Sequence, residues 1–190
     1  MTTLAPTMYE RSFPHVSSAV RNITLILLGS WLVAFFAQIE ILLPFSPVPI
    51  TGQTFAVLLV GALLGSKRGA AAMLAYIAQG AAGLPFFAGG ASGFGILTGA
   101  TAGYLVGFIV ASYVVGLLAE RGMERSFKTS FVPFLVGTVI IYLFGVTWLS
   151  LIVGGFEKAI QLGLLPFVVG DAIKLILAGI ALPSAWKMIQ

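Results

Sequence analysis

Cysteine is absent from this 190-residue chain, and charged residues are scarce. The absence of cysteine excludes disulfides, thiolate metal ligands and cysteine nucleophiles. Charged residues make up 8% of the chain, whereas about 25% is usual in a soluble domain. Hydrophobic residues make up 59%, and the mean hydropathy is +1.07. Because so few charges cannot cover a folded surface, the composition predicts an integral membrane protein.

Motifs for common enzyme chemistry are absent as well. The chain has no G-x-x-x-x-G-K-[ST] phosphate loop, no H-E-x-x-H zinc motif and no G-x-S-x-G nucleophile elbow. Its single histidine, His15, lies in a polar N-terminal stretch, where we expect it to be solvated. The sequence therefore predicts no catalytic residue, no metal and no cofactor, and any ATP hydrolysis is expected to be done by partner subunits.

Apolar runs bounded by charges, proline or glycine predict the fold. They predict six helices, over residues 22–43, 53–65, 69–84, 97–118, 131–153 and 165–188. Spanning a bilayer takes about 20 residues, so the second and third runs must extend into loops or be partly buried in protein. The predicted fold class is all-α, a polytopic membrane protein with one six-helix domain over 22–190. Residues 1–21 lack a signal-peptide pattern and are expected to form a cytoplasmic tail.

Basic residues predict the orientation in the membrane. With six spans, eight of the ten basic residues fall on the face that also holds both termini: Arg11, Arg21, Lys67, Arg68, Arg121, Arg125, Lys128 and Lys187. Short loops rich in lysine and arginine stay in the cytoplasm. The sequence therefore predicts that both termini are cytoplasmic, in the cell (inner) membrane. A spread of charge over loops also argues against a nucleic-acid partner.

Two segments on the opposite face are uncharged and have unusual composition. Residues 44–53 read "PFSPVPITGQ", and residues 85–95 read "PFFAGGASGFG". Prolines reduce the entropy that a loop loses when it is held in one shape. We expect the two segments to pack as a lid over a binding site, although ordinary external turns are the alternative. The third outer connection, 154–163, carries charge.

Asp171 and Lys174 are the only charged residues well inside an apolar run. Because they stand three positions apart, they share one helical face. Each costs roughly 3 kcal/mol at the bilayer centre, so neither is expected to face lipid. One interpretation is a neutralising ion pair without a ligand. The other is a site for a neutral ligand with adjacent N–H and C=O groups, such as an amide, urea or lactam, bound through charge-assisted hydrogen bonds.

Further polar and aromatic residues are candidates for the same site. The remaining predicted ligand-binding residues are Gln79, Tyr76, Gln53, Thr51, Pro49, Phe87, Gly90 and Tyr104. Hydrogen bonds between helices, or anchoring at the membrane interface, would explain the polar ones equally well. Phe87, with Phe86 and Phe94, is expected to give either an apolar wall or interfacial anchors. Glu40 and Glu157 are expected to be solvated.

The first apolar run carries a strip of small residues, Ser30, Ala34 and Ala37. Small residues at this spacing let another helix approach closely. Contact with a partner protein and packing inside the chain explain the strip equally well.

Several longer stretches resemble the BioY family, the biotin-binding S components of energy-coupling factor (ECF) transporters. They are "PVPITGQTFAVLLVGALLGSKRGAAAMLAYIAQGAAGLPFFAGG", "GILTGATAGYLVGF" and "VGDAIKL", which lie between residues 44 and 174. The usual G-P-T-G-G-Y-L of that family reads "GATAGYL" here. The resemblance implies that Asp171 and Lys174 hold the ureido ring of biotin and that segment 44–53 closes over it. It also implies contact between the Ser30 strip and a transmembrane T component that two ABC-type ATPases drive.

Two rival functions are weighed against biotin uptake by an S component. The first is a self-sufficient membrane carrier for biotin or another small cyclic urea or amide vitamin. Uptake by liposomes that lack ATPases distinguishes this carrier from an S component. The second is an intramembrane enzyme that uses Asp171 as a base, which predicts a chemically altered product.

Overall fold

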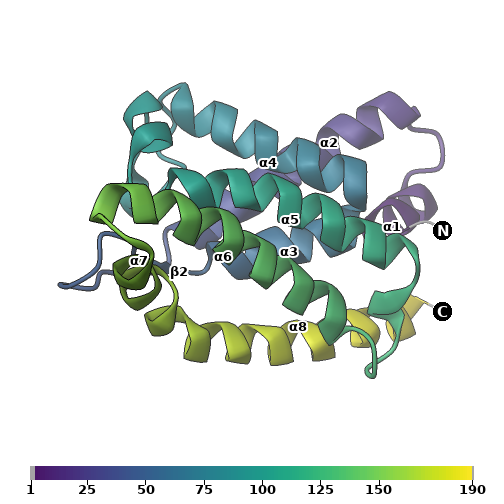
Figure 1. Ribbon diagram of the computed structural model, residues 1–190. Coiled ribbons are helices and arrows are strands. Elements are labelled where there is room, and N and C mark those ends of the chain that lie inside the picture. The colour runs from purple at the N-terminus through teal and green to yellow at the C-terminus, as the bar shows by residue number, and fades with distance from the viewer. Residues whose placement is uncertain (1–2, 190) are drawn as a thin grey trace.

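The computed structural model describes residues 3–189, which form a bundle of helices (Figure 1). The long helices are α2 (Ser18–Ala37), α3 (Gln53–Leu64), α4 (Ser66–Ala81), α5 (Ala102–Glu120), α6 (Phe131–Val153) and α8 (Val168–Ile189). Shorter helical segments are α1 (Leu4–Ser12), η1 (Ala88–Gly90), η2 (Phe94–Thr98), η3 (Met123–Arg125), α7 (Phe156–Gly163) and η4 (Leu165–Phe167). A small hairpin joins α2 to α3 through β1 (Glu40–Ile41) and β2 (Ile50–Thr51).

The predicted helices all exist, and their ends differ where glycine or a hairpin intervenes. Helix α6 has the predicted bounds, and α3 ends one residue early because Gly65 leaves the helix with a φ of 85°. Helix α2 ends at Ala37, well before residue 43, because Glu40 pairs with Thr51 in the hairpin. Helix α5 begins at Ala102 instead of residue 97, because η2 precedes it. The hairpin therefore places segment 42–49 as a loop beyond the helices.

Two short helices lie where connections were predicted. Within the expected N-terminal tail, α1 buries Leu4 and Pro6 against the bundle. In the third outer connection, α7 is amphipathic, since it buries Ala159 and Gly163 and exposes Glu157 and Lys158. Apolar periodicity over eight or nine residues is too short to predict such helices reliably.

Within residues 3–189, four helical stretches are long and apolar enough to cross a membrane. They are Ser18–Ala37, Ala102–Glu120, Phe131–Val153 and Phe156–Lys187, the last of which includes α7 and α8. Helix α3 is apolar but shorter. Large apolar side chains stay exposed on α2, α6 and α8, among them Phe35, Leu151 and Ile176. Such surfaces are typical of helices that face lipid.

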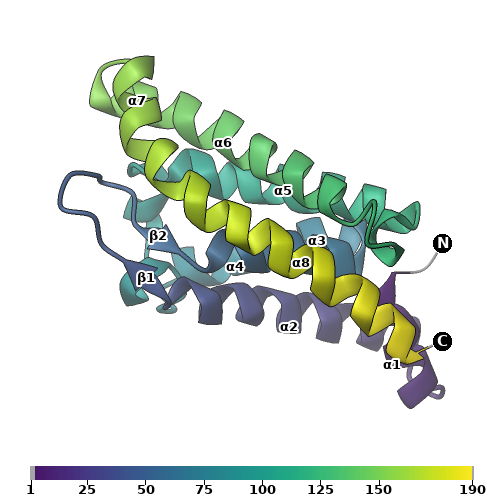
Figure 2. The ribbon, with the colours of Figure 1, turned by 90° about the horizontal axis from the view of Figure 1, so that it is seen from below.

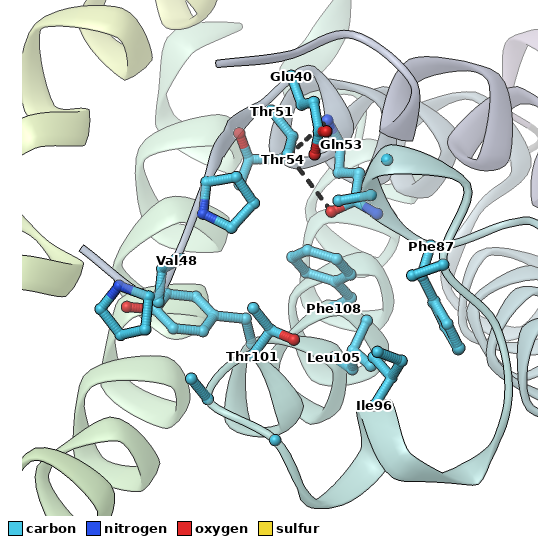
Figure 3. A pocket seen from close by; sticks show the side chains of 18 of the residues that line it. Glu40, Val48, Thr51, Gln53, Thr54, Phe87, Ile96, Thr101, Leu105 and Phe108 are labelled. Atoms are coloured by element: carbon cyan, nitrogen blue, oxygen red, sulfur yellow. Dashed lines mark hydrogen bonds between the residues drawn. The ribbon is translucent and has the colours of Figure 1, made fainter. Parts of the chain in front are cut away.

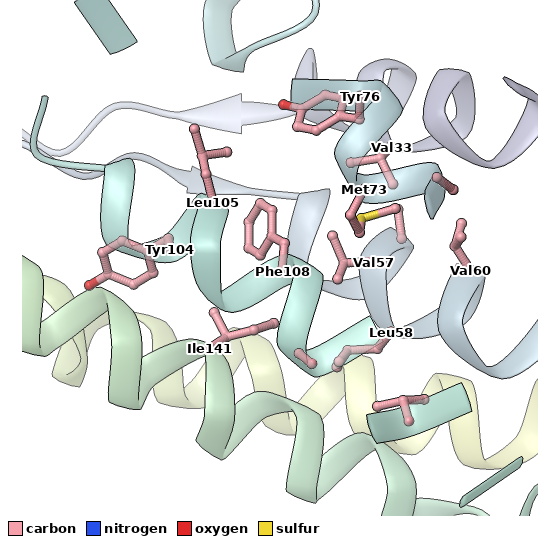
Figure 4. Packing of buried hydrophobic residues seen from close by; sticks show 14 of the residues in the cluster. Val33, Val57, Leu58, Val60, Met73, Tyr76, Tyr104, Leu105, Phe108 and Ile141 are labelled. Carbon is pink, nitrogen blue, oxygen red and sulfur yellow. The ribbon is translucent and has the colours of Figure 1, made fainter. Parts of the chain in front are cut away.

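Helix α5 is the centre of the bundle and packs against α3, α4 and α6. Figure 4 shows the core around it, where Phe108 approaches Val57 of α3 and Ile141 of α6. Close approach depends on glycine: a Cβ added to Gly116 would overlap the backbone of Ser66 at the start of α4. Small residues allow helices in lipid to approach closely, which is how this bundle is packed.

The two ends of the bundle are different. Both described chain ends and the connection from α5 to α6 lie at one end, whereas the hairpin and α7 lie at the other (Figures 1 and 2). A chain whose two ends lie at the same end of the bundle must run along the bundle an even number of times. The predicted lid segments are therefore gathered at the end opposite the termini.

The strip of small residues on α2 is used inside the chain. Ser30 and Ala37 are fully buried, and Ala34 is 7% exposed. A Cβ on the neighbouring Gly29 would press against Leu64 and Ala72, so the strip faces α3 and α4. In this structure the strip packs inside the chain, and contact of these side chains with a T component stays a prediction.

Candidate functional site

A cavity of about 480 Å³ lies at the end of the bundle opposite the termini. Its wall includes β1, the loop to β2, the start of α3, segment 87–91, the start of α5, and one or two residues each from α6, η4 and α8. Figure 3 shows the polar side chains of Glu40, Thr51, Gln53 and Thr54 on one side and Phe87, Ile96 and Leu105 on the other. Cavities of this size and mixed lining typically bind small organic molecules.

Lys174 brings a positive charge to the cavity wall. It shares a face of α8 with Asp171, and its Nζ lies 2.9 Å from Asp171 Oδ1, as the spacing predicts. The same ammonium donates hydrogen bonds to Thr54 Oγ1 at 2.8 Å and to the carbonyl oxygen of Thr51 at 3.0 Å. Three acceptors thus fix the ammonium in place, and the partial burial of the pair is matched by hydrogen bonds.

Asp171 lies one layer behind the cavity. Its carboxylate is 6% exposed and accepts hydrogen bonds from Tyr142, Thr54 and Lys174. A pocket of about 10 Å³, separate from the cavity, contains Asp171 together with Thr54 and Thr138. In this structure Asp171 positions Lys174 and Tyr142, which both line the cavity, and direct contact with a ligand stays a prediction.

The two predicted lid segments approach the cavity from two sides. Pro47, Val48 and Pro49 line it, and Val48 is 5% exposed although it lies in a loop. The Ser46 hydroxyl donates to the carbonyl oxygen of Leu162 in α7 at 2.7 Å, which fastens the loop to the outer end of α7. Ser46 also accepts a hydrogen bond from the Val48 amide at 3.1 Å. Segment 44–53 is therefore fastened at Ser46 and Val48, whereas Pro44, Phe45 and Pro47 stay exposed.

Segment 85–95 forms the other side and rests on Tyr76. Phe87 lines the cavity and meets the Tyr76 ring edge to face at 5.6 Å, while Phe86 stacks on Tyr76 at 6.3 Å. The Tyr76 hydroxyl accepts a hydrogen bond from Gln53 Nε2 and donates one to the carbonyl oxygen of Phe86. Tyr76 is fully buried and does not line the cavity. It supports two residues that do, Gln53 and Phe87.

The other predicted residues divide into two groups. Thr51, Gln53, Pro49, Phe87 and Tyr104 line the cavity, and the Tyr104 hydroxyl donates to the carbonyl oxygen of Gly163 at 2.7 Å.

The structure brings neither Gln79 nor Gly90 to the cavity wall. Gln79 Oε1 accepts from Trp31 at 3.1 Å, and its Nε2 donates to Ser30 at 3.0 Å, which joins α2 to α4. Gly90 has a φ of 73°, and its neighbours Gly89 and Ala91 line the cavity in its place. Phe94 is 75% exposed and forms no part of the wall.

Several lining residues were not predicted. Glu40, expected to be solvated, lines the cavity, and its carboxylate lies beside Gly89, where an added Cβ would come within 2.7 Å of it. Tyr142 and Thr54 are missed because a single tyrosine or threonine in an apolar run has many packing roles. The pair Asp171 and Lys174 is a signal for Thr54, because a partly buried ammonium needs further acceptors besides one carboxylate, and Thr54 is one of them.

A family model described as "BioY family" matches residues 8–190. The chain belongs to the BioY family. Among curated relatives of this BioY chain, the "Biotin transporter BioY" of Thermotoga maritima is 42% identical over 156 residues, covering 82% of this chain and 86% of that protein. The "Biotin transporter BioY" of Rhizobium etli is 39% identical, covering 78% of this chain and 88% of that protein.

A solved structure is similar to the fold of this BioY chain. It is described as the S-component for biotin from an ECF-type ABC transporter, and the match has a TM-score of 0.81. The match covers 90% of this chain and 95% of the other at 24% sequence identity. The match shows that the chain has a mostly helical fold similar to that of this S component.

Proposed function

We propose that this BioY-family protein captures biotin at the outer side of the cell membrane and delivers it inward as the S component of an ECF transporter. The observation that carries the proposal is the lysine in the cavity wall. Lys174 Nζ is held by Asp171 and Thr54 and lines a cavity of about 480 Å³ beneath the lid segments. Family membership and relatives named as biotin transporters support the same function.

The chemistry of the wall suits biotin. The Lys174 ammonium is proposed to exchange one of its three hydrogen bonds, to Asp171, Thr54 or the Thr51 carbonyl, for one to the oxygen of a cyclic urea. The side chains of Thr51 and Gln53 lie together on one side of the cavity (Figure 3). Asp171 is proposed to accept a ureido N–H after a small movement of its side chain or of Tyr142. The apolar wall, with Phe87 and Phe108, suits the thioether ring and the aliphatic tail. Charge-assisted bonds at one end and apolar contact at the other fix the direction of the ligand.

The proposed orientation places both termini in the cytoplasm and the cavity near the outer surface. It rests on the basic residues at the end of the bundle that holds the termini, such as Lys67, Arg121 and Lys128. Helices α2, α3, α4, α5, α6 and α8 would then be the six crossings, with α3 and α4 extended by their flanking residues. The N-terminal segment 1–21, including α1, would lie on the cytoplasmic side.

Energy for transport is proposed to come from partners, because this chain lacks a phosphate-binding loop. A T component and two ABC-type ATPases would supply it, without any cofactor in this chain. Uptake of radiolabelled biotin into liposomes tests this point. Uptake only when the partners and ATP are present supports the S-component role, whereas uptake by this chain alone favours a self-sufficient carrier.

Calorimetric titration of the purified protein with biotin tests the binding proposal. Lys174→Ala should weaken binding by at least about 100-fold, because the cavity loses its donor and Asp171 loses its counter-ion. Lys158→Ala, on the exposed face of α7, is the matched control and should bind as the wild type does. Absence of binding by the wild type, or equal affinity of the two variants, would contradict the proposal.

A further inference from the structure

A second hollow lies on the side of the bundle, between α6 and α8. It is an open groove of about 450 Å³, away from the ligand cavity. Its apolar lining includes Phe127 and Phe131 at one end, and Leu135, Leu175, Ile176 and Gly179 along its length. Helices α6 and α8 contact each other, and residues of both line the groove. No polar side chain lines it, so it offers nothing to a polar ligand.

The groove has a length and depth that suit a lipid chain. It extends along α8 from Ala172 to Ile180, which is about 12 Å of helix at about 1.5 Å per residue. Half of a bilayer's hydrocarbon thickness is about 15 Å. In the proposed orientation the groove runs from Ala172, near the outer start of α8, to Phe131, which begins α6 at the end that holds the termini.

Positive charge gathers at the end of the groove near the chain termini. Lys187 Nζ lies 4.8 Å from the centre of the Phe127 ring, which closes that end of the groove. Lys128, the next residue after Phe127, is exposed. Glu124, the one acidic residue of the connection 121–130, is fully buried, so its carboxylate does not meet an approaching phosphate. The surface at the mouth of the groove is therefore cationic.

We propose that the groove between α6 and α8 binds one anionic phospholipid, with an acyl chain along Leu175 and Gly179 and the phosphate at Lys128 and Lys187. The two lysines at one end of the groove suit the phosphate, and the apolar groove is about as long as one leaflet is thick, which suits an acyl chain. Together these two features indicate an anionic phospholipid. Each basic side chain near an anionic headgroup contributes about a fivefold factor in affinity. The groove is distinct from the ligand cavity, because no groove residue lines that cavity.

Native mass spectrometry of the full-length protein in detergent tests the proposal. The protein is incubated with equal amounts of dioleoyl phosphatidylglycerol and dioleoyl phosphatidylcholine. We expect one phosphatidylglycerol to be retained in preference to phosphatidylcholine. Removing both cations with Lys128→Gln and Lys187→Gln should lower retention of phosphatidylglycerol by about 25-fold. Lys158→Gln on α7 removes an exposed charge elsewhere and should leave the preference unchanged.

Filling the groove is the second arm of the test. A Cβ at Gly179 meets no atom closer than 3.6 Å, so Gly179→Leu places its side chain in the groove without backbone overlap. It should abolish retention of either lipid at the site, and Leu135→Trp should do the same from the α6 wall. Gly170→Leu is the matched control on α8, because nothing lies within 4 Å of an added Cβ there.

Three outcomes would overturn the proposal. Equal retention of the two lipids would mean that the cations do not select a headgroup. Unchanged retention in folded Gly179→Leu and Leu135→Trp variants would place the lipid elsewhere. A dimer that becomes a monomer in those variants would assign the groove to a second copy of the chain.

Discussion

At the scale of single residues, the site is a chain of side chains that hold one another in place. Lys174 is fixed by Asp171, Thr54 and the Thr51 carbonyl, and Asp171 is fixed in turn by Tyr142. The polar atoms of these four side chains bond one another, so removing one leaves another without its hydrogen bond. Substitutions in the second layer are therefore expected to affect binding almost as strongly as those in the wall.

Asp171→Asn tests this second layer. We expect biotin binding to weaken by at least about 100-fold, because Lys174 becomes a partly buried charge without a counter-ion. The amide also presents a donor where Tyr142 and Lys174 both need an acceptor. Calorimetry measures the affinity, with Glu157→Gln on the exposed face of α7 as control. Wild-type affinity in a folded Asp171→Asn protein would refute the role.

Glu124 gives a pH dependence at the other end of the molecule. Burial in the connection between α5 and α6 raises the pKa of its carboxyl, and Arg125, whose Nε lies 3.6 Å away, only partly opposes this. Between the ordinary and the raised pKa, the folded protein keeps a proton that the unfolded chain releases. Stability should therefore fall as pH rises through that window.

Thermal unfolding from pH 4.5 to 8 measures the effect of Glu124. Glu124→Gln should remove this part of the decline in melting temperature with rising pH. Glu157→Gln, an exposed carboxyl, should leave the decline in place. Parallel curves for the wild type and Glu124→Gln would show that Glu124 does not titrate in this range.

At the scale of elements, segment 44–53 is the part of the site whose movement is expected to control ligand release. Pro47 and Pro49 line the cavity, and the loop is fastened to α7 by Ser46. Replacing both prolines with glycine should raise the rate of biotin release by about 4- to 30-fold, because each proline contributes about 0.4–1 kcal/mol by limiting the open conformations of the segment. Stopped-flow displacement measures the release rate. An unchanged rate would mean that the segment is no lid.

Contact between α5 and α4 depends on one glycine. A Cβ at Gly116 would overlap the backbone of Ser66, which cannot turn aside as a flexible side chain could. We expect Gly116→Ala to destabilise the protein by about 2 kcal/mol, as overpacking of a tight contact does. Thermal melting in detergent measures this loss against Gly170→Ala, which meets no atom within 4 Å. Equal melting temperatures of the two variants would show that α4 moves to accommodate the methyl group without a loss of stability.

The elements themselves were largely predictable, and the contacts between them were not. Hydropathy and proline marked the six long helices, and α6 matched to the residue. The hairpin was missed because its strands have two residues each, too few for an alternating pattern. Gln79 and Ser30 were assigned to sites because polarity within an apolar run does not reveal direction, and in the structure they bond each other. The pair Asp171 and Lys174 was found because charge in an apolar run has few explanations.

At the scale of the whole molecule, the lack of cysteine offers a direct test of topology. A single cysteine placed at Lys67, Lys128 or Glu157 is the sole thiol in the chain. In intact cells, a membrane-impermeant maleimide should label Glu157→Cys on α7 and leave Lys67→Cys and Lys128→Cys unlabelled until the cells are broken. The reverse pattern would invert the orientation, and labelling of all three in intact cells would contradict the six crossings.

The hydrogen bond from Ser46 to Leu162 has a mechanical consequence. Leu162 lies only a few residues before α8, the helix that carries Lys174. We therefore expect an outward movement of segment 44–53 to pull on the connection that leads to α8 and Lys174. Opening of the cavity and displacement of the Lys174 ammonium would then occur together.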